Sequence, residues 1–66
     1  MNITLNGEAR EIRDRLTVAE LVAELGLRPE QVAVELNRQL VTRARRDEAE
    51  LSEGDEVELV TLVGGG

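Results

Sequence analysis

The 66-residue sequence contains no cysteine, no histidine and no aromatic residue. A disulfide is therefore excluded, and so are the usual zinc ligand sets, so we expect no metal site. The core must consist of Leu, Val, Ile and Ala, and the chain has no ring on which a base could stack. A domain this short buries only about 60% of the surface of its unfolded chain. Its stability must therefore come from packing, helix caps and turns.

Positive charge and long apolar segments are also scarce. Fourteen acidic residues oppose eight basic ones, all arginine, and the net charge is −6. Phosphate groups attract cations, so we expect no nucleic acid and no anionic membrane as a partner, and a basic protein surface fits better. The first residues, MNITLNGE, lack the basic and apolar regions of a signal peptide, and no apolar run approaches the roughly 20 residues of a membrane span. We therefore expect a cytoplasmic protein.

The beginning of the sequence predicts a β-hairpin. Apolar and polar residues alternate over positions 1–6, which is typical of a strand with one buried face. Asn6 and Gly7 both tolerate the positive φ of a type I′ turn. We expect the return strand over 8–12, and its weak alternation indicates an edge strand.

The segment LTVAELVAELGL predicts a helix with signals at both ends. Thr17 and Glu20 have the spacing of a capping box, and Leu16 precedes the cap as a hydrophobic staple requires. Gly26 suits the left-handed position after the last turn, with Leu27 following it. The apolar residues with helical spacing, expected to face the core, are Val18, Leu21, Val22 and Leu25.

The remaining segments predict further strands. Alternation over 32–37 indicates a strand, and positions 40–41 form a short extended piece. The charged segment 42–51 is expected to be a loop with one helical turn, anchored by Leu51. After a turn at Gly54-Asp55, the residues EVELVTLV form the last strand. A small sheet with one helix across one face, an α+β fold, is the simplest way to bury the helix stripe.

The last strand has apolar residues on both faces near its end. If Val57 and Leu59 face the helix, Val60 and Leu62 lie on the uncovered face of the sheet. Single exposed apolar residues are common on protein surfaces and need no function. The alternative is that Val60 and Leu62 form a docking surface for a partner.

Three of the six glycines follow this strand as Gly64, Gly65 and Gly66. Glycine has no Cβ, so such a segment can enter a narrow channel and adopt backbone angles closed to other residues. Three residues extend roughly 10 Å beyond the preceding valine at about 3.3–3.6 Å each. The glycines are either a meaningless extension or a thin tail that a partner requires.

The sequence resembles the β-grasp sulfur carriers, in particular those of thiamine biosynthesis. The features that carry the resemblance are the Asn-Gly hairpin, the capped helix, the segment VAVELN, the Gly-Asp turn and an apolar last strand before Gly-Gly. The resemblance covers essentially the whole chain. It implies a β-grasp (ubiquitin-like) fold, with a mixed sheet in a domain over 1–63 and a flexible C-terminal tail over 64–66. Members of the family often have an aromatic residue near the last strand, and a Gly or Pro near the positions that Arg38 and Thr42 occupy here.

The resemblance also implies a carrier rather than an enzyme, with no cofactor of its own. An ATP-dependent adenylating (E1-like) enzyme activates the carboxylate of Gly66. Sulfur from a cysteine desulfurase route then gives a thiocarboxylate, and thiazole synthase receives that sulfur. Gly64 and Gly65 are expected to enter the active sites of the partner enzymes. Val60 and Leu62 are expected to form the surface on which those enzymes dock. Without cysteine the chain has no side chain to hold sulfur, and its Asp, Glu and Arg residues offer no nucleophile–base arrangement.

Three alternatives stay open at this point. The sulfur carriers of molybdopterin synthesis share the fold and the terminal chemistry, although their chains are usually longer. A ubiquitin-like modifier would use its terminal glycine in an isopeptide bond to a lysine of a target. A plain interaction domain would have no use for the glycines.

Overall fold

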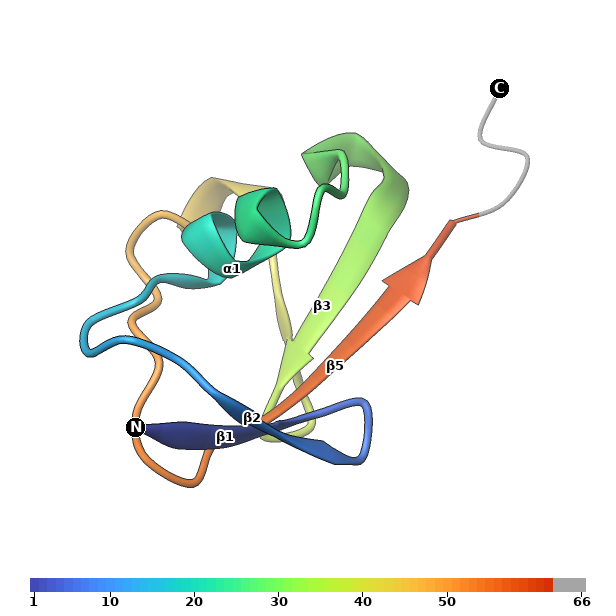
Figure 1. The fold of residues 1–66 in the computed structure, drawn as a ribbon. Helices are drawn as coiled ribbons and strands as arrows, with labels where there is room; N and C mark the ends of the chain where they lie inside the picture. Colours follow the sequence, from blue (N-terminus) through green and yellow to red (C-terminus); the bar gives the residue numbers. More distant parts are fainter. Residues whose placement is uncertain (63–66) are drawn as a thin grey trace.

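The computed structural model describes residues 1–62, which form a five-stranded sheet with one helix across one face (Figure 1). The strand order is β2-β1-β5-β3-β4, and the sheet is mixed because β1 and β5 run parallel while the other neighbours run antiparallel. The elements, in chain order, are β1 (Asn2–Leu5), β2 (Glu8–Glu11), α1 (Val18–Glu24), the 3₁₀ turn η1 (Pro29–Gln31), β3 (Val32–Leu36), β4 (Gln39–Val41), the 3₁₀ turn η2 (Arg43–Arg45) and β5 (Glu56–Thr61). The predicted mixed sheet with one helix is confirmed.

Both hairpins turn on two residues with positive φ. In the β1–β2 turn, Asn6 has φ 49° and Gly7 has φ 83°, as a type I′ turn requires. The β3–β4 turn uses Asn37 and Arg38 with φ 51° and 70°. The predicted edge strand is β2, and its range ends one residue before the predicted boundary. Ile12, which is buried in the core, still exchanges backbone hydrogen bonds with Met1 at 2.7 and 2.8 Å.

The predicted signals at the two ends of α1 are both present. The Thr17 Oγ1 accepts from the Glu20 N–H at 3.1 Å, and the Glu20 carboxylate accepts from the Thr17 N–H at 2.9 Å, which completes the capping box. At the other end Gly26 has φ 75° and its N–H donates to the Ala23 carbonyl at 3.0 Å. The Leu27 N–H donates to the Val22 carbonyl at 3.2 Å, so the helix ends in a Schellman motif.

The core lies between α1 and the sheet. The predicted helix stripe is confirmed, with three of its members buried and Leu25 packed at the edge of the core. The buried apolar residues are Ile3, Ile12, Leu16, Val18, Leu21, Val22, Val32, Val34, Leu51 and Val57. The face of β3 and β5 away from α1 is covered by no other described element (Figure 1). Among residues 1–62, no helix is long and apolar enough to cross a membrane.

The charged segment between β4 and β5 contains the predicted helical turn, η2, and the predicted anchor, Leu51, which is buried. It also buries Arg46, which the sequence did not predict. The Arg46 guanidinium donates to the carbonyls of Pro29 at 2.9 Å and Val32 at 2.7 Å. The Ala49 carbonyl accepts from the Val18 N–H at 2.9 Å. The segment is therefore fastened both to the start of β3 and to the start of α1.

Candidate functional site: the uncovered face of the last strand

Strand β5 turns one set of side chains into the core and the other to solvent. Val57 is buried and Leu59 is half-buried, on the face that α1 covers. Val60 and Leu62 are 55% and 51% exposed, as the alternation predicted. We call Val60 and Leu62 the apolar patch. It lies at the end of β5, and the glycines at 64–66 follow it in the sequence after one further residue.

Carboxylates lie next to the apolar patch on β5 and on the neighbouring strand β3. Val60 lies opposite Ala33, and Glu58 lies opposite Glu35. Like charges directly opposite each other on a sheet repel, so this pair lowers the stability of the protein when no partner is bound. Glu35, Glu56 and Glu58, which we call the acidic band, form no ion pair within residues 1–62. The uncovered face therefore presents an apolar end and a negatively charged middle.

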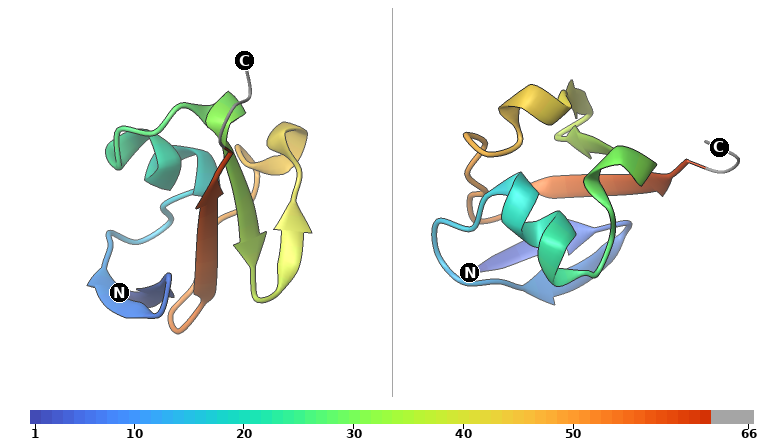
Figure 2. Two further views of the ribbon diagram at one scale, coloured as in Figure 1. Left: turned by 90° about the vertical axis from the view of Figure 1, so that its right-hand side faces the viewer. Right: turned by 90° about the horizontal axis from the view of Figure 1, so that it is seen from above.

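Hydrogen bonds hold β5 up to the last described residue. On the β3 side, the Leu62 N–H donates to the Gln31 carbonyl at 2.7 Å. On the β1 side, the Asn6 side-chain amide contacts both backbone groups of Leu59. The apolar patch is thus held against a paired strand, and β5 runs outward at one end of the molecule (Figure 2). The predicted tail residues Gly64, Gly65 and Gly66, and the predicted boundary at 63, lie outside the described residues.

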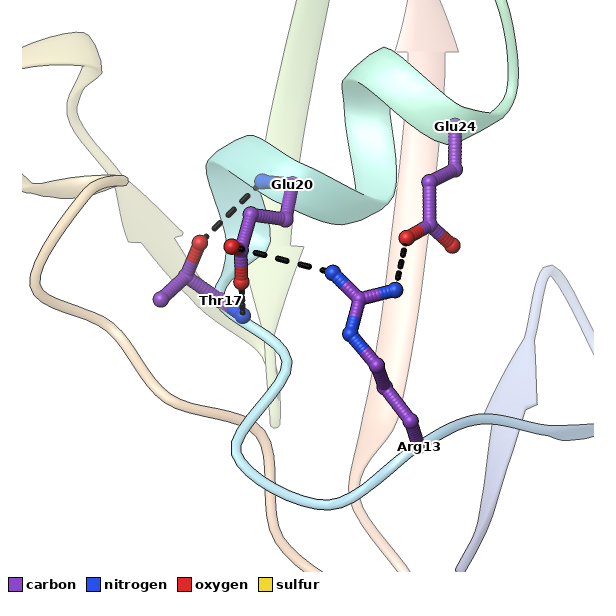
Figure 3. Close-up of polar contacts among 4 residues, drawn as sticks. All are labelled: Arg13, Thr17, Glu20 and Glu24. Atoms are coloured by element: carbon purple, nitrogen blue, oxygen red, sulfur yellow. Dashed lines mark hydrogen bonds and ion pairs between the residues drawn. The ribbon is translucent and has the colours of Figure 1, made fainter.

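The main cluster of ion pairs lies elsewhere, beside α1 (Figure 3). The Arg13 guanidinium donates to the Glu24 carboxylate and lies 3.7 Å from that of Glu20. The hydrogen bond to Glu24 is the main reason that the pKa of Arg13 is raised. The pKa of Glu20 is lowered chiefly because its carboxylate accepts the Thr17 backbone N–H. In this cluster each group stabilises the charged form of the side chain beside it. None of these groups is a base placed beside a nucleophile.

Within residues 1–62 no group of three or more His, Cys, Asp or Glu side chains is arranged to hold a metal ion. Among these residues, Val60 and Leu62 are the exposed apolar residues that the sequence indicated as a candidate docking surface. Together with the acidic band they form the candidate site.

Comparison with known proteins covers essentially the whole chain. The model of the ThiS family matches residues 3–66. The sulfur carrier protein ThiS of Bacillus subtilis is 35% identical over 65 residues, which are 97% of this chain and 98% of that protein. Thiazole synthases of Paramagnetospirillum magneticum and Magnetococcus marinus are 36% and 41% identical over all 66 residues, but the chain spans only 20% of their length.

A solved structure confirms the predicted fold. The crystal structure of the thiamine biosynthesis protein ThiS from Geobacter metallireducens superposes with a TM-score of 0.86 at 36% sequence identity, and the match covers all of both chains. The predicted β-grasp fold and the predicted resemblance are both confirmed. The chain therefore belongs to the ThiS family of sulfur carriers.

Proposed function

We propose that this chain serves thiamine biosynthesis as a sulfur carrier, with the sulfur held as a thiocarboxylate on Gly66, and that it is not itself an enzyme. The observation that carries the proposal is the position of the apolar patch. Val60 lies in the paired strand β5 and Leu62 follows its end, and both are exposed. One residue separates Leu62 from the glycines in the sequence. A partner bound at Leu62 would be four positions from Gly66 in the sequence.

The chemistry requires a free carboxylate at Gly66. A terminal carboxylate has a pKa of about 3.3–3.7, so at neutral pH it is an anion and a poor electrophile. An ATP-dependent adenylating (E1-like) enzyme joins the carboxylate oxygen to AMP and releases pyrophosphate. A persulfide, supplied by a cysteine desulfurase route, then attacks the carbonyl carbon and displaces AMP. A thiol reduces the resulting acyl disulfide, which leaves the thiocarboxylate on the carrier and a disulfide between the two thiol groups. Because Gly64 and Gly65 have no Cβ, they can enter a narrow active site.

Thiazole synthase is the proposed recipient of the sulfur. Two thiazole synthases contain a region similar to this entire chain, which fits a carrier and a synthase that work together. The partners bind in the cytoplasm through the apolar patch, and the acidic band favours a partner with basic residues around an apolar centre.

Incubation with the adenylating enzyme, ATP and a sulfur donor, followed by intact-mass spectrometry, tests this proposal. The intact chain should gain the mass difference between one oxygen and one sulfur. Deletion of Gly66 leaves a chain that still ends in glycine, but its carboxylate reaches about 3.5 Å less far. A misplacement of about 1 Å can already cost roughly a hundredfold in rate, so little or no exchange is expected.

The Gly66→Val variant keeps the full length of the chain. It therefore tests steric hindrance at the terminal carbonyl carbon without shortening the distance that the carboxylate reaches. Its branched side chain crowds the carbonyl carbon, so it should also gain little sulfur. Equal exchange in all three chains, or none in the intact chain with a competent enzyme, contradicts the proposal. Accumulation in cells of conjugates to target lysines, with no thiocarboxylate, would indicate a modifier instead.

A further inference from the structure

Strand β5 has a backbone partner on both sides over only part of its length. On the β3 side the pairing runs from Val57 to Thr61. On the β1 side the pairing includes only Glu56 and Val57. Beyond that point β1 has ended and the chain has entered the β1–β2 turn, which lies beside β5 (Figure 1).

The side chain of Asn6 takes the place of the missing strand residue. Its Nδ2 donates to the Leu59 carbonyl at 3.3 Å, and its Oδ1 accepts from the Leu59 N–H at 2.8 Å. The backbone N–H of Asn6 donates to the Val57 carbonyl at 2.9 Å. A carboxamide has the donor and acceptor of a peptide group, so it can pair with both backbone groups of one residue. Asn6 therefore continues the ladder on this side by one more step.

This step is the last one before the apolar patch. Among residues 1–62, Leu59 is the final residue of β5 with a hydrogen-bond partner from the β1 side. Val60 follows it directly, and Leu62 is held only from the β3 side. Hydrogen bonds on one edge alone let a strand twist or fray, whereas bonds on both edges fix its direction.

We propose that Asn6 is a positioning residue for sulfur transfer: its side-chain amide fixes the direction of the end of β5, and with it the position of the apolar patch. This inference rests on the proposed function. It assigns to the β1–β2 turn, 53 positions away from Leu59 in the sequence, a part in presenting the apolar patch.

The chain supplies a matched control in Asn37. Asn37 occupies the same place in the β3–β4 turn, with φ 51° against 49° for Asn6. Its Oδ1 accepts from the Glu56 N–H at 2.9 Å, and its Nδ2 donates to the Asp55 carboxylate at 3.1 Å. Both asparagines therefore accept from a backbone N–H of β5, Asn37 at its first residue, Glu56, and Asn6 further along at Leu59, next to Val60 of the apolar patch.

The experiment compares Asn6→Gly with Asn37→Gly. Glycine accepts a positive φ at no steric cost, so each turn is kept and only the side-chain amide is lost. In Asn6→Gly, amide hydrogen exchange at the Leu59 N–H should accelerate at least about tenfold relative to Asn37→Gly. In the mass-spectrometric transfer assay, kcat/KM for the carrier should fall at least about tenfold in Asn6→Gly, and stay within about twofold of the parent chain in Asn37→Gly.

Several results would overturn the inference. Equal exchange at Leu59 in the two variants would show that the amide does not hold the end of β5. Accelerated exchange with unchanged transfer would show that the direction of the strand end does not matter for transfer. If the parent chain forms no thiocarboxylate, the proposed function fails and the positioning role fails with it, while the exchange comparison still decides whether the amide fixes β5. If Asn6→Gly does not fold, Asn6→Asp, which keeps the acceptor for the Leu59 N–H and loses the donor, should show the same changes to a smaller extent.

Discussion

Arg46 is a buried cation in a segment whose sequence looks like a solvated loop. It is 5% exposed, and two of its N–H groups bond to backbone carbonyls while its Nε has no partner within residues 1–62. Burial lowers the pKa of its guanidinium, and the nearby positive charge of Arg43 lowers it further. An arginine keeps its proton in spite of such a shift. The Arg46 guanidinium therefore links the segment after η2 to the start of β3 through hydrogen bonds from a charged group.

Replacement of Arg46 by alanine tests this link. Hydrogen bonds to charged groups contribute about 1.5–3 kcal/mol each, and Arg46→Ala removes two of them together with buried aliphatic contacts. The free energy of unfolding, measured in urea, should fall by at least about 1.5 kcal/mol. Arg43→Ala is the control, because Arg43 is exposed and its loss should change stability by less than about 0.5 kcal/mol. Similar losses in both variants would contradict a specific role for Arg46.

At the scale of single elements, α1 depends on its ends. It has only seven residues, and isolated helices of fewer than about 12–15 residues are marginal in water. The capping box, the Schellman motif and burial of one stripe together keep it folded. Arg13 adds ion pairs from the preceding loop, but these are exposed and contribute little.

Loss of the cap hydroxyl should therefore be measurable. Thr17→Ala removes the acceptor for the Glu20 N–H, and loss of an N-cap costs about 0.5–2 kcal/mol. We expect a lower urea midpoint with an unchanged dependence on denaturant. Thr17→Ser keeps the hydroxyl and should stay close to the parent chain. If Ala and Ser behave alike, the hydroxyl is not what stabilises the start of α1.

The capping box also predicts a contribution to acid sensitivity. The pKa of Glu20 is lowered in the folded chain, mainly by the Thr17 backbone N–H. Its stabilising contribution is therefore complete above the ordinary carboxyl pKa of about 4.3 and is lost as the pH falls through the lower folded value. Glu20→Gln keeps an acceptor and does not titrate, so its melting temperature should fall less between about pH 6 and about pH 2.

The control for that measurement is Glu48→Gln. Glu48 is exposed, and its carboxylate has no hydrogen bond or ion pair within residues 1–62. Its replacement should leave the acid dependence of the melting temperature close to that of the parent chain. If both variants have the parent profile, the capping carboxylate makes no pH-dependent contribution.

At the scale of the whole molecule, one helix on a five-stranded sheet leaves one face uncovered, and the proposed docking surface lies there. Val60→Asp should leave the fold intact because Val60 is 55% exposed. It places a charge in the apolar patch, beside the acidic band. The affinity for the adenylating enzyme should fall at least about tenfold, or about 1.4 kcal/mol.

Leu40→Asp is the matched control for this prediction. Leu40 is 67% exposed and lies opposite Glu35, so it belongs to the same face but to the edge strand β4. Its replacement should change the affinity much less. Unchanged affinity of a folded Val60→Asp variant would rule out docking through the apolar patch. Equal losses for both variants would indicate a general effect of added negative charge.

The sequence alone determined the local structure of this protein. Apolar residues repeat every second position in the strands and about every 3.6 positions in α1. The ends of elements are indicated by Asn-Gly in the first turn, by Thr17 and Glu20 at the start of α1, and by Gly26 at its end. The exposure of Val60 and Leu62 also followed from alternation, because successive side chains of a strand must point to opposite faces. These signals are readable because each depends on residues a few positions apart.

The tertiary structure decided what depends on residues far apart. It placed β5 in the centre of the sheet, parallel to β1, and it brought Glu58 opposite Glu35. It buried Arg46 because the carbonyls of Pro29 and Val32 lie within its reach, whereas its charged neighbours in sequence indicated a solvated loop. It also joined the Asn6 side chain to Leu59. No periodicity encodes such pairs, because they form only when packing of the core fixes how the strands lie beside one another.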